Sequence, residues 1–508
     1  MKAYLMFRDR DFDIKAEPCF EKDTLIADLE LKRILANMAQ GDETIYDACE
    51  AAFFRPLQAK EEIGYRQKNL CDALKNPDAV RRLYEITVET EKQRRSSWHW
   101  LSSAYLSSTF SSAVELLKLY TEMLMELRFV ADSKLSGFQS EGFRKLLTML
   151  QRELDDDYFA EVRAHLNDLK DRDGTLVSAT LGNYLQGVDY VFRRKIRQGF
   201  WRRWHFSPSF TLAARDDAGA IDLGKRRDRA INEATNALAQ AAEHLEGFFA
   251  MLRSELAFYV GCLNLADSLR ALGMAICIPD LIPLERQDRS WQELYDVSLV
   301  LTKNEAVIGN ELTTENKRLY IITGANQGGK STFLRSIGQA QIMAQCGMFV
   351  GAKNFSAPIR NGLFSHFKKE EDTAMKSGKL DEELSRMSML ADHLLSGSLM
   401  LFNESFAATT EREGSEICRQ ITQALIDNGV EVFSVTHLYT YASTFLNDPN
   451  TQFLRAQRLD NGERTFRVTA GEPIQTAFGE DLYRKIFAEV SRASFNQWIT
   501  PAEATDNT

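Results

Sequence analysis

The sequence is short of the features that mark metal-binding, secreted and membrane proteins. Its seven cysteines are scattered and never form a C-x-x-C pair, which argues against a zinc site and for reduced thiols. No uninterrupted apolar run approaches the roughly 18 residues that span a bilayer. The opening residues, MKAYLMFRDRDFD, are too charged for a signal peptide. Together these absences predict a globular cytoplasmic protein.

The charge balance excludes one class of binding protein. The formal net charge is −10 and the pI is near 5.5, so the chain is not a generally basic nucleic-acid coat protein. A local basic surface stays compatible with this balance, because binding follows the local field more than the net charge. The composition, 44% hydrophobic and 26% charged, is that of a globular protein, and 508 residues predict about three domains.

The chain divides into three segments that differ in residue pattern and in predicted secondary structure. Residues 1–21 predict a short lead-in that contains a strand. Residues 22–295 have few prolines and repeat apolar residues at spacings of three and four, which predicts a helical core or lever domain. Residues 296–508 carry apolar strands that end in polar residues, and they predict an α/β domain with a mostly parallel sheet.

The longest helix is expected over residues 230–273. Apolar residues alternate there by four and three for more than three heptads, between Leu238 and Leu263. Gly273 and the two prolines that follow it end the pattern. A helix of about 40 residues would be ~60 Å long. It fits either a packed antiparallel bundle or a lever that carries movement between distant sites, and the sequence leaves both open.

An arm interrupts the helical segment near residues 174–206. Residues 174–182, GTLVSATLG, predict a strand or one half of a hairpin. Residues 192–206, FRRKIRQGFWRRWHF, then interleave basic and aromatic side chains, as a nucleic-acid contact requires. A half-buried, solvated strand pair would show the same pattern. The candidate DNA-contacting residues are Arg193, Arg194, Lys195, Arg197, Arg202 and Arg203.

A glycine-rich loop gives the strongest signal in the sequence. Residues 324–331, GANQGGKS, fit the pattern G-x-x-x-x-G-K-[ST], between an apolar strand and a helical stretch. The backbone N–H groups of such a loop close around phosphates at a helix N-terminus. Lys330 is expected to reach the β- and γ-phosphates of ATP, and the Ser331 hydroxyl to ligate Mg²⁺. The predicted phosphate-binding residues are Gly324, Asn326, Gly328, Gly329, Lys330, Ser331 and Thr332.

A second apolar strand, residues 398–402, ends in Asn403 and Glu404. This is the Walker B arrangement, in which an acidic group holds Mg²⁺ through water and the next glutamate polarises the attacking water. Glu404 stands at the catalytic position, but asparagine replaces the expected aspartate. Asn403 keeps an oxygen for a water-mediated Mg²⁺ contact and lacks the charge, so we expect weaker Mg²⁺ affinity and slower hydrolysis. A third strand, residues 430–436, ends in His437, placed to sense the γ-phosphate.

These motifs resemble those of the MutS family of DNA mismatch-repair proteins. The resemblance lies in TGANQGGKST, in IMAQCGMFVGAKNFSAPIRNGLFSHF after it, and then in SGKLDEELSRM, NESFAATTEREG and VFSVTH, in the family's order. RTFRVTAGEPIQTAFGEDLYRKIF is similar to the family's closing strand, turn and final helix. FFRPLQAKEEIGYRQKNLCDALKNPDAVRRLY resembles the start of its core domain. The likeness covers about residues 22–490 and is thin between about 100 and 230.

The resemblance implies an α/β P-loop ATPase domain of the ABC type, with ATP and Mg²⁺ as ligands, preceded by the all-α core domain. It also implies a homodimer formed through the ATPase domains. It places the adenine-stacking position at Val307, where a valine predicts weak stacking. It places the signature serine, which reaches the partner subunit's γ-phosphate, at Gly378 next to Ser377, and the signature glutamate at Glu383.

The resemblance also bears on the DNA substrate. The short lead-in leaves no room for the family's mismatch-reading and connector domains, and no nuclease tail of the Smr type follows residue 498. We therefore expect recognition of branched or otherwise distorted double-stranded DNA through the core domain and the arm.

Three functions stay open at this point. The first is a dimeric ATPase of MutS type that clamps or releases mismatched, branched or distorted DNA in repair or recombination. The second is a non-enzymatic, nucleotide-gated binding protein in which Asn403 has weakened hydrolysis. The third is an ABC- or SMC-like ATPase outside mismatch repair, which ranks last because the sequence has no LSGGQ-like signature and no transmembrane segment.

Replacing Arg193, Arg194, Arg202 and Arg203 together with alanine tests the DNA contact. We expect weaker binding to all DNA sequences alike, and a log–log salt dependence flatter by nearly one unit per lost contact, about four in all. Binding titrations at several salt concentrations, beside a melting curve, measure both quantities. Normal affinity with a normal salt slope would place the DNA contact elsewhere.

Overall fold

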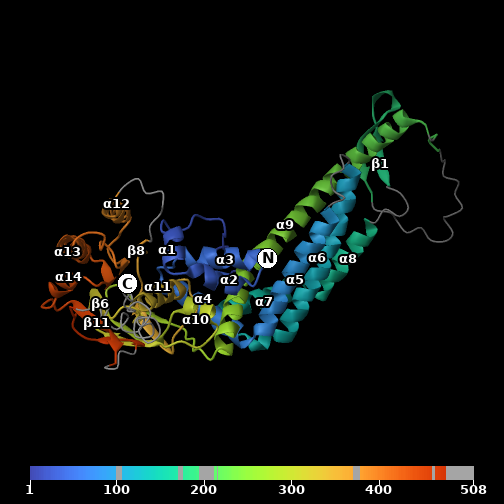
Figure 1. Ribbon diagram of the computed structural model, residues 1–508. Coiled ribbons are helices and arrows are strands. Elements are labelled where there is room, and N and C mark those ends of the chain that lie inside the picture. Colours follow the sequence, from blue (N-terminus) through green and yellow to red (C-terminus); the bar gives the residue numbers. More distant parts are fainter. Residues whose placement is uncertain are drawn as a thin grey trace, which may run out of the picture. The chain divides into compact units, whose positions relative to one another are not determined.

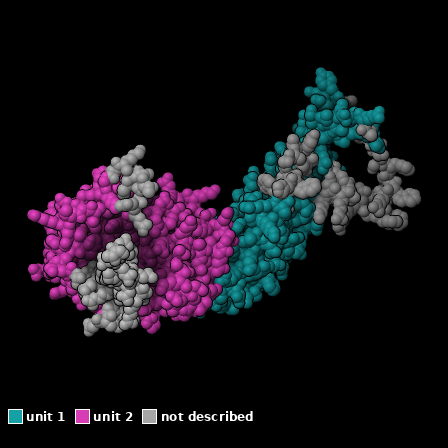
Figure 2. All heavy atoms as spheres, in the orientation of Figure 1, with its two compact units in different colours: residues 1–13, 68–260 teal, residues 14–67, 261–508 magenta. Residues whose placement is uncertain are grey.

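A computed structural model describes most of the chain. The described residues are 1–98, 106–169, 176–193, 211–213, 215–369, 378–459 and 464–475. The chain forms two compact units, coloured separately in Figure 2: unit 1 comprises residues 1–13 and 68–260, and unit 2 comprises residues 14–67 and 261–508. The division differs from the predicted segments, because residues 14–67 pack with the C-terminal part of the chain.

Unit 1 is a bundle of helices that run side by side (Figure 1). Tyr120 and Phe249 stack with their ring centroids 5.7 Å apart, and Arg94 pairs with Glu246 at 3.0 Å, so two helices are fastened to a third. The helices are α5 (Pro77–Trp98), α6 (Leu106–Lys134), α7 (Glu141–Glu153), α8 (Asp156–Asp168), the short 3₁₀ helix η1 (Leu135–Gly137), and the unit 1 residues of α4 (Lys60–Lys75) and α9 (Asp217–Ala271).

Helix α9 contains the predicted heptad pattern and is longer than predicted, with 55 residues from Asp217 to Ala271. Leu252, Leu256 and Leu263 of the heptad pattern are all buried. One 18-residue stretch of α9 is apolar enough, by length and composition, to cross a membrane, although it contains no uninterrupted apolar run of that length. Because 78% of that stretch is buried inside the protein, we interpret it as a core segment.

The lead-in differs from its prediction. Residues 1–21 form bends and turns, so the expected strand is wrong. Residues 1–13 are held by side chains of α9 instead of by strand pairing: the Glu255 carboxylate accepts hydrogen bonds from the backbone N–H groups of Leu5, Met6 and Phe12, and the Tyr259 hydroxyl donates to the Leu5 carbonyl at 2.6 Å. Burial raises the pKa of Glu255 to about 7 despite these three donors.

The predicted arm contains an antiparallel hairpin. Strands β1 (Val177–Leu181) and β2 (Gly187–Phe192) pair across a turn that includes the 3₁₀ helix η2 (Asn183–Leu185). Arg193, directly after β2, donates from Nε to the Ser178 hydroxyl at 2.9 Å.

Unit 2 is built on a six-stranded sheet in the order β12-β11-β6-β10-β9-β8. Five neighbouring strands are parallel, and β12 at the edge is antiparallel to β11. The mixed α/β architecture with a mostly parallel sheet is as predicted. The strands are β6 (Leu319–Gly324), β8 (Leu363–Phe367), β9 (Leu399–Asn403), β10 (Glu431–Val435), β11 (Thr451–Arg458) and β12 (Arg464–Ala470).

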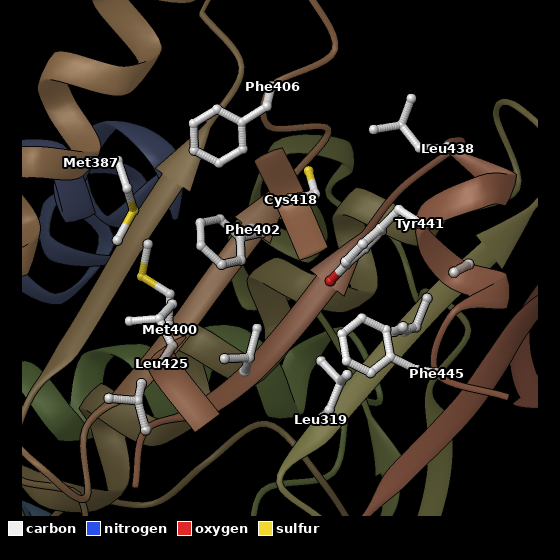
Figure 3. Packing of buried hydrophobic residues seen from close by; sticks show 14 of the residues in the cluster. Leu319, Met387, Met400, Phe402, Phe406, Cys418, Leu425, Leu438, Tyr441 and Phe445 are labelled. Atoms are coloured by element: carbon white, nitrogen blue, oxygen red, sulfur yellow. The ribbon is translucent and has the colours of Figure 1, made fainter. Parts of the chain in front are cut away.

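Helices cover both faces of this sheet. Successive residues of a strand point to opposite faces, and the central strands are apolar at nearly every position, so both faces need to be buried. In Figure 3, Met400 and Phe402 of β9 lie in one cluster with Cys418 and Tyr441 from the covering helices. Leu401, between them, packs on the opposite face against α11 at Gly338. The cluster side carries α12 (Lys379–Ala391), α13 (Glu411–Asp427) and α14 (Tyr439–Ser443), and the opposite side carries α11 (Lys330–Gln345).

A second, four-stranded sheet in the order β3-β7-β4-β5 lies in the same unit. Residues 14–67 pack here too, because the Leu57 N–H donates to the Gln345 carbonyl at 2.9 Å and Arg66 donates to the Cys346 carbonyl at 2.8 Å. The remaining elements are α1 (Lys22–Asp28), α2 (Leu31–Ala39), α3 (Glu43–Phe53), α10 (Val297–Lys303), β3 (Asp280–Ile282), β4 (Arg289–Leu294), β5 (Asn310–Thr314) and β7 (Asn354–Pro358).

A buried charge cluster joins the two sheets. Glu431, on β10, accepts a hydrogen bond from Arg289 of β4, with Nε 2.7 Å from Oε1. It also pairs with Arg360, just after β7, with Nη2 2.6 Å from Oε2. All three side chains are almost completely buried. Burial and the neighbouring Arg289 lower the pKa of Arg360 to about 10, and the Glu431 carboxylate opposes this shift.

Replacing Glu431 with glutamine should destabilise unit 2 strongly. We expect the free energy of unfolding to fall by about 3–5 kcal/mol, because two buried guanidinium groups would lose their only counter-charge in the cluster. Urea unfolding followed by circular dichroism measures the change. Glu416→Gln, which removes an exposed partner of Arg419 on α13, is the matched control and should leave the midpoint unchanged. Equal midpoints for the two variants would contradict the role of the cluster.

Candidate nucleotide-binding site

The glycine-rich loop lies between the end of β6 and the start of α11, as the sequence pattern predicts. Gly329, the N-cap of α11, has φ of 89°, a left-handed conformation that a side chain would strain. At Gly328, an added Cβ would lie 2.9 Å from the Ala325 carbonyl oxygen and from the Ala456 side chain. Glycine is therefore required at both positions for the loop to close in front of the helix N-terminus.

Lys330 begins α11 and is 5% exposed. Its ammonium group donates to the carbonyl oxygens of Gly324 at 2.9 Å and Ala325 at 3.1 Å, so it is folded back along the loop. Burial lowers the pKa of Lys330, an effect that the Glu404 carboxylate opposes and the Arg464 guanidinium strengthens. Phosphate oxygens at this position would offset that desolvation and favour the charged form.

A cavity of 690 Å³ opens at the loop and is large enough for a nucleotide. Lys330, Ser331, Thr332 and Asn326 line it together with Gly328 and Gly329. Gly324, at the end of β6, is not among the lining residues; it belongs to the loop through the bond from Lys330 to its carbonyl.

Val307 lines the same cavity, and so do two apolar residues that the sequence did not single out, Ile308 and Phe466. The Phe466 ring belongs to β12 and is 51% exposed. Its backbone lies beside the loop, because a Cβ on Gly329 would be 3.6 Å from the Phe466 carbonyl oxygen. The signal that would have found Phe466 is the pairing of β12 with β11, which itself pairs with β6.

The polar end of β9 meets the start of α11. The Ser331 hydroxyl donates to Oδ1 of Asn403 at 2.9 Å, which brings together the two residues expected to hold Mg²⁺. Both atoms are oxygens, the ligand type that Mg²⁺ prefers, so the pair fits the ion, although neither carries a charge. Glu404 lines the cavity with φ of 54°, held by its N–H donating to the Val435 carbonyl at 2.9 Å.

Comparisons with known proteins agree with this geometry. Residues 58–272 match the family model of the MutS2 N-terminal domain, and residues 320–470 match that of MutS domain V. The second match spans the glycine-rich loop, Asn403, Glu404 and β12. The chain belongs to the MutS family.

Three MutS relatives illustrate how far the similarity extends. The DNA mismatch repair protein MutS of Thermotoga neapolitana is 31% identical over 181 residues, which are 35% of this chain and 22% of that protein. Human MutS protein homolog 4 is 27% identical over 249 residues, or 45% and 26%. Endonuclease MutS2 of Thermus thermophilus is 29% identical over 134 residues, or 26% and 18%. The chain therefore matches about a quarter or less of each relative's length.

The other positions expected from the MutS resemblance lie away from the cavity lining. His437 is exposed and follows β10 by two residues. Glu383, on α12, is 7% exposed and points inward, since it accepts a hydrogen bond from the Phe406 N–H. Gly378 is the N-cap of α12, and Ser377 before it lies outside the described residues.

The candidate DNA-contacting residues of the arm are placed only in part. Arg193 follows β2 and contacts Ser178. Arg194, Lys195, Arg197, Arg202 and Arg203 lie outside the described residues.

Replacing Lys330 with alanine should abolish tight ATP binding, because it removes the buried cation that would offset the β- and γ-phosphates. We expect the affinity to fall by about a hundredfold, the equivalent of about 3 kcal/mol for a charged hydrogen-bonding group. Titration calorimetry measures the change. Lys353→Ala, which removes a surface partner of Glu293, serves as the control and should bind ATP normally. An unchanged affinity in Lys330→Ala would end the assignment of the phosphate site.

Proposed function

We propose that this protein is an ATPase of MutS type, with a P-loop domain of the ABC class, that couples the nucleotide state to the binding of distorted DNA. The observation that supports it most is the 690 Å³ cavity, in which the glycine-rich loop, Lys330 and the acidic residue after β9 converge. The matches to both MutS family models support the same reading.

The proposed binding mode follows from the residues that line the cavity. The triphosphate lies along the backbone N–H groups of residues 326–331, at the N-terminus of α11, with the Lys330 ammonium against its β- and γ-phosphates. The adenine ring lies between the apolar side chains of Val307 and Phe466. An aromatic ring at position 466 supplies the stacking that the valine cannot.

Ser331 and Asn403 would hold Mg²⁺, which when bound neutralises charge on the phosphate oxygens. Glu404 orients the attacking water, because it is the carboxylate at the cavity wall nearest in sequence to the Mg²⁺ pair. His437 senses the γ-phosphate in this scheme, and its exposed position after β10 requires it to turn toward the nucleotide when ATP binds.

DNA is the proposed macromolecular partner, and the arm is the proposed contact. The basic–aromatic run of residues 192–206 follows β2 directly, and its charge suits phosphates in an otherwise acidic protein. The relative named as a DNA mismatch repair protein supports mismatched DNA as the ligand, and we extend the proposal to branched or otherwise distorted duplexes in repair or recombination. We further propose a homodimer formed through unit 2, and a cytoplasmic location.

Asn403 favours a second candidate, a nucleotide-gated binding protein that hydrolyses ATP slowly. The Ser331–Asn403 hydrogen bond supplies oxygen atoms without the negative charge of an aspartate. In this alternative the bound nucleotide sets the DNA-binding state, and turnover is not required.

Mg²⁺-dependent ATP turnover, measured with no DNA, with a perfect duplex, with a mismatched duplex and with a four-way junction, tests the proposal. Turnover that a distorted DNA changes more than the perfect duplex supports the ATPase of MutS type. ATP-dependent binding to distorted DNA without turnover supports the gated binding protein. If the protein shows no turnover and ATP has no effect on its DNA binding, both proposals are refuted.

Glu404→Gln should keep ATP bound and slow turnover by about a hundredfold or more, because an amide cannot act as the base that the carboxylate supplies. Asn403→Asp should tighten Mg²⁺ binding, since it restores a full negative charge near the ion. Steady-state kinetics at several Mg²⁺ concentrations measures both effects, and the turnover of Lys330→Ala is subtracted as the background rate. Parental turnover in Glu404→Gln would mean that another residue, or a contaminant, hydrolyses the ATP.

A further inference from the structure

A buried histidine contacts the residue that follows Glu404, the proposed catalytic carboxylate. His366, near the end of β8, is 1% exposed and has no place in the binding scheme above. The parallel register of β8 and β9 sets His366 beside Phe402 and Phe367 beside Asn403. The His366 ring therefore lies at the level where β9 gives way to the segment 404–406.

The ring forms a reciprocal contact with the residue that follows Glu404. The Ser405 hydroxyl donates to the His366 carbonyl at 2.6 Å, and Nδ1 of His366 lies 2.8 Å from the same hydroxyl oxygen. A serine hydroxyl has one proton: while it is on the carbonyl, Nδ1 is the donor of the second bond, and a ring protonated at Nε2 instead accepts from the hydroxyl at Nδ1. Burial lowers the pKa of His366 to about 4, so the ring is neutral at pH 7.

Helix α12 completes the enclosure of this segment. Arg386 donates from Nη2 to the Phe367 carbonyl at 3.0 Å, and the same nitrogen lies 3.3 Å from Nε2 of His366. The Glu383 carbonyl oxygen lies 3.1 Å from Nε2 and accepts from it when the ring carries a proton there. The Glu383 carboxylate accepts from the Phe406 N–H, and the Phe406 ring stacks on His366 with centroids 5.0 Å apart.

The segment needs this enclosure because its backbone is strained. Glu404 has φ of 54° and Phe406 has φ of 59°, in the left-handed region of backbone conformation that residues other than glycine and asparagine rarely adopt. Such a conformation persists only when surrounding contacts fix it. Without those contacts, a relaxed backbone would turn the Glu404 carboxylate away from the cavity.

We propose that His366, Ser405 and Glu383 form a bracket that positions Glu404, and that α12 holds Glu404 in place through this bracket. The inference rests on the proposed ATPase function and assigns positioning roles to three residues that do not touch the nucleotide. It also gives Glu383 a different role from nucleotide contact, since its carboxylate holds the Phe406 backbone. Because Gly378, where the MutS resemblance places the signature serine, caps α12, a displacement that begins at Gly378 would reach Glu404 through α12 and the bracket.

Two substitutions of His366 separate the bond to Ser405 from the rest of the ring. The amide nitrogen of asparagine can occupy the place of Nδ1 and donate to Ser405, whereas that of glutamine reaches the place of Nε2. Both lose the stacking on Phe406. We therefore expect His366→Asn to retain kcat within about threefold, and His366→Gln and Ser405→Ala to lower kcat by about tenfold to a hundredfold, the order of loss for a catalytic group misplaced by about 1 Å.

The Michaelis constant and the ATP affinity should stay at parental values in all three variants, because none of them lines the cavity. Ser398→Ala is the matched control: Ser398 is fully buried at the opposite end of β9, and its hydroxyl has no hydrogen-bond partner among the described residues. It should leave kcat unchanged. Equal kcat values in the asparagine and glutamine variants, a parental kcat in Ser405→Ala, or a parallel loss of ATP affinity would each overturn the bracket.

Amide hydrogen exchange keeps this test separate from the ATPase proposal. In a peptide that covers residues 404–409, we expect exchange about tenfold faster in Ser405→Ala and His366→Gln than in the parent, while His366→Asn stays close to the parent. This readout needs no turnover, so it tests the bracket even if the parent hydrolyses no ATP. Unchanged exchange in Ser405→Ala would show that Ser405 does not hold the segment.

Discussion

Helix α11 is buried along nearly its whole length, with 13 of its 16 residues inaccessible, although it carries three glutamines and a lysine. Burying an amide without partners would cost several kcal/mol, so each glutamine needs a fixed counterpart. Gln339 contacts the Leu29 carbonyl and Asp296, Gln341 contacts the Pro358 carbonyl, and Gln345 contacts the Leu57 carbonyl. These bonds tie the N-terminal helices and the second sheet to one helix, which explains why residues 14–67 belong to unit 2.

The candidate site depends on this fixed helix. Phosphates at the loop would meet N–H groups at the start of a helix that these bonds hold in place. The side of the cavity that holds Glu404 is different, since Glu404 stands on a strained segment rather than within a strand or helix. One wall of the site is thus held by α11, and we propose that side chains of β8 and α12 hold the other.

Local patterns carried the accurate predictions. The heptads of α9 and the loop that ends in Lys330 and Ser331 are encoded in consecutive residues, so the sequence alone located both. Phe466 was not predicted as a site residue, because its place beside the loop depends on the order of strands in the sheet. The bond between His366 and Ser405 was not predicted either, since 39 residues separate two side chains that only the parallel pairing of β8 and β9 brings together. The strand expected in the lead-in failed because tertiary contacts with α9, and not a neighbouring strand, take up its backbone groups.

The single carboxylate that two arginines share has a consequence for how unit 2 comes apart. Glu431 belongs to the six-stranded sheet, Arg289 to the four-stranded sheet, and Arg360 to the segment that leaves β7. Separating the two sheets would break these ion pairs. Each sheet would then hold charged side chains without a counter-charge, which is unfavourable unless water enters. Such a pair adds little net stability over apolar side chains, yet breaking it is costly. The two sheets therefore form one cooperative unit, and partial opening between them is suppressed, so the nucleotide cavity at their boundary keeps its shape until the whole unit unfolds.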